Sequence, residues 1–109
     1  MPNYSDVLDG AFGALASPVR RRVLVELASG PAAVTELARP FDMALPSFLR
    51  HVTLLEDAGC VATEKTGRVR TCRLLPAPLE RAQGWLGEQR AVWEARTDRL
   101  ERFLREEDR

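Results

Sequence analysis

Apolar residues recur at helical spacing in three stretches of this chain. The first stretch, residues 4–16, has its apolar positions at Val7, Leu8, Ala11 and Leu15. The second begins at Ser17 and Pro18, an N-cap residue followed by proline at the first helical position, and continues to Gly30. The third is much longer, covers residues 78–106 and follows a proline-containing segment. Each stretch predicts an amphipathic helix.

Two shorter helices are predicted between the second and third stretches. Thr35 begins a helix that Pro40 ends, and residues 46–58 form another helix that Gly59 stops. The residues on the inner face of this second helix are Phe48, Val52 and Leu55. The residues that point away from the core are Pro46, Ser47, Leu49, Arg50 and Thr53. Two helices with so short a connection form a helix-turn-helix pair, whose second helix can enter a DNA major groove.

Residues 60–74 contain two strand-like runs joined by a basic turn. Arg68 and Arg70 alternate with apolar or neutral residues, so both project from one side of a hairpin, close to Lys65. A recognition helix with a basic hairpin beside it describes a winged helix-turn-helix. The predicted fold is therefore mostly α with a small β-hairpin, in one domain of residues 1–109.

A homodimer is the expected assembly, because 109 residues with 45% hydrophobic content bury only a modest core. The long final helix has a narrow apolar stripe, which needs a partner helix. The predicted dimerisation helices are residues 4–16 and 78–106. Their expected interface residues are Val7, Leu8, Leu15, Leu86, Trp93, Leu100 and Phe103. Trp85 and Trp93 could alternatively line a ligand pocket between these helices, although aromatic residues at helical spacing are more often core or interface.

The distribution of charge favours DNA binding more than the zero net charge does. Residues 18–73 hold nine Lys and Arg against six Asp and Glu, so the positive charge lies around the helix-turn-helix and the hairpin. No run of about 18 apolar residues exists to span a membrane, and the start lacks the basic residues of a signal peptide. We therefore expect a cytoplasmic protein with no membrane partner.

Cofactor and enzyme chemistry have few residues to draw on. The chain has two cysteines and one histidine, too few for a zinc cluster or a catalytic triad. We expect no metal, no cofactor and no enzymatic activity. The single histidine, His51, titrates near neutrality and could act as a ligand or pH switch, but a structural or phosphate-contacting role is favoured.

Three arginines open the second helix, where the helix dipole disfavours cations. Arg20, Arg21 and Arg22 therefore have some other role: either contact with a DNA phosphate or salt bridges to Asp6, Asp9 or the C-terminal acids. Leu49 also has two interpretations, contact with thymine methyl groups or packing on the preceding helix. The full set of expected DNA-binding residues is Arg20, Arg21, Pro46, Ser47, Leu49, Arg50, His51, Thr53, Lys65, Arg68 and Arg70.

Cys60 and Cys72 lie on the two predicted strands. A three-residue turn at 65–67 places them opposite each other, whereas a two-residue turn at 66–67 pairs Val61 with Cys72. Both cysteines should point to the core, with the basic groups on the opposite face, so we interpret them as small buried hydrophobic residues. The prediction is no redox switch: operator affinity should be the same in reductant and after mild oxidation.

The order of elements and two motifs resemble the ArsR family of bacterial transcriptional repressors. The motifs are Leu15-Ala-Ser-Pro-Val-Arg-Arg-Arg-Val-Leu24 and Pro46-Ser-Phe-Leu-Arg-His-Val-Thr-Leu-Leu-Glu-Asp-Ala-Gly59, within a likeness that covers about residues 4–104. The resemblance implies that the first and last helices form a dimer interface, that the recognition helix reads the major groove and that the wing lies on the backbone.

This chain departs from the metal-sensing members of that family. They carry a Cys-x-Cys type pair where it has Glu36-Leu-Ala-Arg-Pro-Phe41, or Asp, His and Glu ligands in a final helix that here contains no histidine. The likeness is thus to the branch without metal sites. Where the family commonly has serines in the recognition helix, this chain has Ala44 and Leu49.

The sequence thus predicts a homodimeric regulator, most simply a repressor, that binds a pseudo-palindromic DNA operator. An inducer is possible, but the sequence does not show whether one exists or what it is. The alternative is a dimeric protein-interaction module in which the basic wing is incidental. Strongly salt-dependent DNA binding would favour the regulator, and no shift on any DNA would favour the interaction module.

Overall fold

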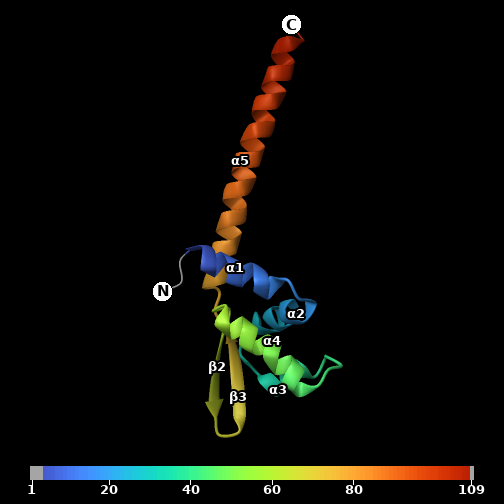
Figure 1. Cartoon of the computed structure of the whole chain (residues 1–109), viewed down its shortest axis with the longest axis vertical. Coiled ribbons are helices and arrows are strands. Elements are labelled where there is room, and N and C mark those ends of the chain that lie inside the picture. Colours follow the sequence, from blue (N-terminus) through green and yellow to red (C-terminus); the bar gives the residue numbers. More distant parts are fainter. Residues whose placement is uncertain (1–3, 109) are drawn as a thin grey trace.

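The structure, a computed structural model, describes residues 4–108. Its helices are α1 (Tyr4–Leu15), α2 (Pro18–Leu27), α3 (Val34–Ala38), α4 (Leu45–Asp57) and α5 (Ala77–Glu107), and its strands are β1 (Ala32–Ala33), β2 (Val61–Thr66) and β3 (Val69–Leu74). In Figure 1, α2, α3, α4 and the strands gather on one side of α1, and α5 extends away from the other side as a long rod. The tip of the β2–β3 hairpin lies at the opposite end of the molecule from the C-terminus.

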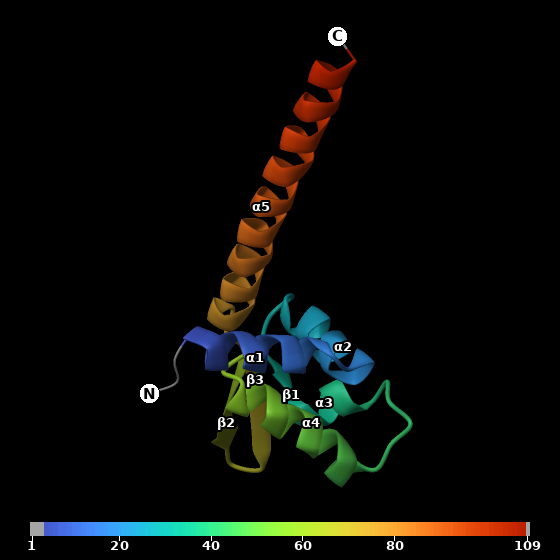
Figure 2. The ribbon, with the colours of Figure 1, turned by 45° about the horizontal axis from the view of Figure 1, so that its top comes forward.

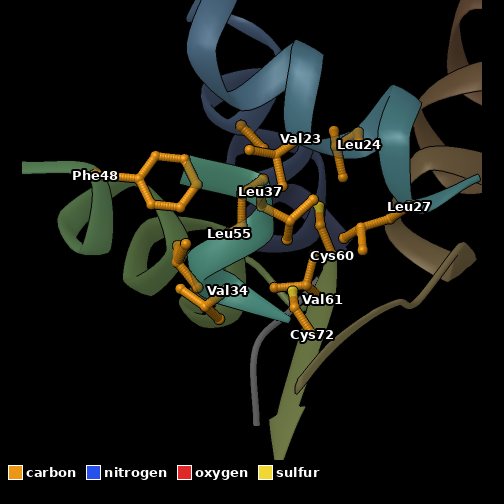
Figure 3. Close-up of a cluster of buried hydrophobic side chains, with 12 residues drawn as sticks. Val23, Leu24, Leu27, Val34, Leu37, Phe48, Leu55, Cys60, Val61 and Cys72 are labelled. Carbon is orange, nitrogen blue, oxygen red and sulfur yellow. The ribbon is translucent and has the colours of Figure 1, made fainter. Parts of the chain in front are cut away.

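The main core forms where α2, α3 and α4 meet the sheet (Figure 3). Phe48, Val52 and Leu55 of α4 are at most 1% exposed, which confirms the inner face expected from their spacing. They pack with Val23, Leu24 and Leu27 of α2, with Val34 and Leu37 of α3, and with Cys60, Val61 and Cys72 of the wing. The apolar face of each element is thus covered by the others.

The start of α2 follows the sequence prediction closely. Ser17 is extended and its hydroxyl accepts a hydrogen bond from the Arg20 backbone N–H at 3.3 Å, while Pro18 occupies the first helical position. Proline costs nothing there, because the first N–H groups of a helix have no partner within it. Gly10 of α1 lies over Ala58, where an added Cβ would be 3.4 Å from the alanine Cβ, so this glycine permits close packing of α1 on the end of α4.

The described strands form one antiparallel sheet with the order β1-β3-β2. Both hairpin registers expected from the sequence are wrong. Thr66 pairs with Val69 and Thr63 with Cys72, so the two turn residues are Gly67 and Arg68. Of these two turn residues, Gly67 has a positive φ, at 62°, and Arg68 does not, as in a type II′ turn with glycine at its first central position. The predictions had placed this glycine last in the turn.

β1 was not predicted. Its two residues, Ala32 and Ala33, pair with Cys72 and Thr71 of β3. Alanine has low strand propensity, and two residues cannot show an alternating pattern, so the sequence carries no strand signal here. The strand exists because the free edge of β3 offers main-chain partners to the link between α2 and α3.

α1 packs across the beginning of α5 (Figure 2). Leu8, Ala11, Ala82 and Trp85 form this second cluster, and the rings of Phe12 and Trp85 meet edge to face with centroids 5.8 Å apart. Beyond Trp85 every described residue of α5 is exposed, Trp93 by 70% and Leu100 by 58%. In the described part of the chain, no helix is long and apolar enough to cross a membrane.

Candidate nucleic-acid interface

α3 and α4 are the two helices of the predicted helix-turn-helix. The segment 39–44 joins them, and within it Phe41 stacks on Phe48 of α4 with ring centroids 5.5 Å apart and an interplanar angle of 28°. This contact ties the turn to the buried face of α4. Packing of the buried face on the core therefore stabilises α4 and turns its opposite face outward.

The outward face of α4 carries the residues that the sequence placed there. Pro46, Ser47, Arg50 and Thr53 are exposed, whereas Leu49 is half-buried. Leu49 packs against the main core with part of its side chain and borders surface hollows with the rest, so its packing still leaves hydrocarbon exposed to a partner. The Thr53 hydroxyl donates to the Leu49 carbonyl at 3.1 Å, one turn earlier in the helix.

Two exposed leucines of α4 were missed by the sequence analysis. Leu45 is 46% exposed and Leu54 is 51% exposed. The signal that could have found Leu45 is its position one helical turn before Leu49. The outer face of α4 is thus richer in hydrocarbon than its polar residues suggested.

Arg20 links α2 to both α1 and α4. Its Nε donates to the Ala14 carbonyl at 3.2 Å and its Nη2 to the Gly13 carbonyl at 2.8 Å, which satisfies acceptors at the C-terminal end of α1. Its Nη1 lies 3.1 Å from Nδ1 of His51. Arginine can only donate, so Nδ1 accepts and the ring proton of His51 is on Nε2.

His51 is consequently held in its neutral form. Burial is the main cause that lowers the pKa of His51 below its usual value of 6.5, and the nearby Arg20 charge lowers it further. This contact supports the structural member of the two roles, structural or phosphate-contacting, that the sequence favoured. The other two arginines of the group also have partners: Arg21 donates to the Leu15 carbonyl at 2.7 Å, and Arg22 pairs with Glu26 at 3.0 Å. The sequence did not reveal that Arg20 and Arg21 donate to carbonyl groups at the end of α1, because this role depends on where α1 ends in space.

The wing brings a second set of cations beside α4. Arg70 forms an ion pair with Glu56 of α4 at 2.9 Å and donates to the Thr63 hydroxyl at 3.1 and 3.0 Å. Lys65 lies opposite Arg70 in the register. Within residues 4–108, no ion pair holds Lys65, Arg68 or Arg50. These three side chains are exposed and their charges are available to a polyanion.

The wing and the beginning of α4 border a shared hollow of about 520 Å³. Leu45 and Leu49 line it from the helix, and Lys65, Arg68 and Arg70 line it from the hairpin. The helix side of the hollow is therefore apolar, and the hairpin side combines these three cations with Thr63 and Val69.

The two cysteines are buried and unbonded, as the hydrophobic interpretation required. The register places Cys72 opposite Thr63, while the Cys60 carbonyl accepts from the backbone N–H of Leu75 at 2.8 Å, so the two residues are not cross-strand partners. Burial raises the pKa of Cys60, and it raises that of Cys72 to about 11, helped by Glu56 and opposed by Arg70.

One expectation about the cysteine environment was wrong. Alternate residues of a strand share a face, so Arg70 projects from the same side of β3 as Cys72 rather than from the opposite side. The described residues include no group of three or more His, Cys, Asp or Glu side chains placed to hold a metal ion.

A helix-turn-helix pair with a basic hairpin beside its second helix defines the winged helix-turn-helix class of DNA-binding proteins.

Comparison with known proteins agrees with this class. A helix-turn-helix domain family, HTH_20, matches residues 15–64. The crystal structure of the ArsR family transcriptional regulator RHA00566 is similar to this chain with 53% identity and a TM-score of 0.81, over 86% of this chain and 97% of that one. The chain belongs to the ArsR family. It is a DNA-binding transcriptional regulator and not an enzyme.

Two further proteins are similar over most of the domain. The transcriptional regulator Rv2034 of Mycobacterium tuberculosis is 38% identical over 71 residues, and the match spans 65% of this chain and 66% of that protein. The homodimeric winged helix-turn-helix DNA-binding domain of Mb0332 from Mycobacterium bovis is 25% identical with a TM-score of 0.61, over 84% of this chain and 82% of that one.

Proposed function

We propose that this chain is a homodimeric repressor that binds a pseudo-palindromic operator. The observation that carries the proposal is the division of the molecule into two ends (Figure 1). The outward face of α4 and the unpaired cations of the wing lie toward one end, and the exposed apolar residues of α5 lie toward the other. One end suits DNA and the other suits a second copy of the chain.

The second copy is supported by α5. Leu86, Trp93, Leu100 and Phe103 are each more than 50% exposed on a helix of 31 residues. An isolated helix with such a stripe is stabilised by burying it against another helix. Homodimerisation of the similar domain from Mb0332 supports the same assembly. Leu8 and Leu15 belong to the proposed interface less directly, because each already packs within its own chain.

Dimerisation and DNA binding are coupled in this proposal. A twofold axis presents the two α4 helices to successive major grooves, about 34–36 Å apart, so one chain alone makes half of the contacts. Arg50 reads a base from α4, and Lys65 and Arg68 contact phosphates. Arg70 contributes only through the donors that its ion pair with Glu56 leaves free. Occupied promoter DNA is then closed to transcription.

The decisive experiment is selection of binding sites from a random DNA library, followed by footprinting and by sedimentation of the complex. We expect two inverted half-sites about one helical turn apart, two chains per site and a steep decrease in affinity with salt. Arg50→Ala should relax the preference at one base pair per half-site, at a cost of about 1–3 kcal/mol there. Arg102→Ala, on the exposed face of α5 away from the proposed stripe, is the matched control and should leave the selected site unchanged.

Selection of no sequence, with binding to no DNA at any salt concentration, would refute the proposal and favour a protein-interaction module. A selected site without inverted symmetry, bound by one chain, would refute the dimeric part alone.

A further inference from the structure

The outer face of α4 offers DNA mostly hydrocarbon. Leu45 and Leu54 are about half exposed, Pro46 is exposed, and Leu49 is half-buried between them. The polar groups on this face are few, and one of them is already used: the Thr53 hydroxyl donates to the Leu49 carbonyl at 3.1 Å. The Thr53 hydroxyl can therefore only accept a further hydrogen bond, and its methyl group adds hydrocarbon to this face.

The two leucines at the beginning of α4 stand one turn apart and act as one surface. Both border the hollow of about 520 Å³ between α4 and the wing. Leu49 also borders a second hollow of about 530 Å³, together with Pro46, Arg50 and Thr53. A group placed in either hollow would therefore touch Leu49.

The charges around this apolar surface select its occupant. Arg50, Lys65 and Arg68 surround it and have no ion-pair partner among residues 4–108. A second copy that docked face to face here would bring the same cations together, which is unfavourable. A polyanion with apolar groups in its accessible groove fits both properties. In the DNA major groove, the apolar group is the C5 methyl of thymine.

We propose that Leu45 and Leu49 are specificity-determining residues that read thymine methyl groups in the major groove. The inference rests on the proposed DNA-binding function and adds the chemistry of recognition. Its consequence is that the half-site contains thymines whose methyl groups, rather than their hydrogen-bonding edges, carry the preference, while Arg50 supplies the directional contact.

The test replaces single thymines of the selected operator by deoxyuridine, which removes one methyl group and leaves base pairing unchanged. Burial of one methyl group strengthens binding about fourfold. We expect one or two positions per half-site at which this replacement weakens binding of the wild-type protein by about that factor. At the same positions, Leu45→Ala or Leu49→Ala should bind the thymine and deoxyuridine operators equally, because the coupling between the two changes is lost.

Two controls make the test decisive. Val25→Ala removes similar hydrocarbon from α2, where Val25 is 67% exposed, and should keep the full sensitivity to deoxyuridine. Leu45 is exposed enough that Leu45→Ala should fold normally, so the test does not depend on the half-buried Leu49.

The outcomes separate the inference from the function on which it rests. Binding to no DNA overturns both. Tight, selective binding in which every deoxyuridine replacement is neutral overturns this inference and leaves the proposed function intact. A change in self-association in the leucine variants, with DNA affinity unaltered, also overturns it and assigns the surface to a protein contact.

Discussion

Arg20→Gln removes the side chain that joins the end of α1, the start of α2 and the recognition helix. The guanidinium makes two partly buried hydrogen bonds, to the Ala14 carbonyl and to His51, and one exposed bond to the Gly13 carbonyl. Buried hydrogen bonds to a charged group contribute about 1.5–3 kcal/mol each, but partial solvent exposure reduces this. We expect a loss of about 2 kcal/mol in the free energy of unfolding and a midpoint about 10 °C lower at fixed protein concentration.

The same substitution should change the titration of His51. NMR can follow this cleanly because the chain has one histidine. The wild-type pKa should lie below 6.5, and in Arg20→Gln it should rise only part of the way to 6.5, because burial is the larger cause and remains. The ring nitrogen shifts should report the Nε2–H tautomer in the wild type and a mixture in the variant.

The sign of the effect on stability follows from this lowered pKa. The unfolded chain binds a proton at His51 more readily than the folded chain does, so the stabilisation is fully present above pH 6.5. It is lost as the pH falls from 6.5 through the lower pKa of the folded state. The variant should lose less stability in that window than the wild type.

A matched control is Arg22→Gln, on the same helix. Arg22 forms an exposed ion pair with Glu26 one turn away, so its replacement should cost less than about 0.5 kcal/mol and leave the His51 titration unchanged. The reasoning is refuted if wild-type His51 titrates at or above 6.5, or if Arg20→Gln and Arg22→Gln have the same midpoint and the same His51 pKa.

The remaining predictions concern the wing, the dimer and the thiols. Arg68→Ala should weaken binding to specific and non-specific DNA alike and flatten the salt slope by about 1. Glu56→Gln should strengthen binding to both kinds of DNA, because it frees Arg70. If Arg68→Ala weakened binding to the operator alone, the wing would read bases. Leu100→Asp should sediment as a monomer with sharply reduced DNA affinity, and a monomer of full affinity would contradict the coupling. Cys60 and Cys72 should react with thiol reagents only slowly in the folded protein, and mild oxidation should leave operator affinity unchanged; a recovered disulfide that abolishes DNA binding would disprove this.

The helices could be predicted from the sequence because each has a local signal. Pro18 and its N-cap serine mark the start of α2, and the spacing of Phe48, Val52 and Leu55 identifies the buried face of α4. These features depend on neighbours a few residues away. The turn at Gly67 also has a local signal, although the position of this glycine within the turn was predicted incorrectly.

The parts that could not be predicted depend on residues distant in sequence. β1 forms only because the edge of β3 is available, and the contacts of Arg20 require the end of α1 and the middle of α4 to meet beside it. The pairing of Arg70 with Glu56 likewise joins the wing to α4 across the fold. Periodicity along the chain carries no signal for such long-range contacts, which is why other partners were predicted for the arginines at the start of α2.

The short strand β1 has a mechanical consequence for the wing. Main-chain pairing of Ala32 and Ala33 with β3, together with the ion pair between Arg70 and Glu56, fixes the hairpin to the body that carries α4. These contacts limit how far the wing can move to follow the backbone of a duplex that does not match it. The DNA then has to supply part of the adjustment, and the energy of bending it depends on its sequence. Base pairs that the protein never touches, between and beside the half-sites, should then contribute to the choice of operator.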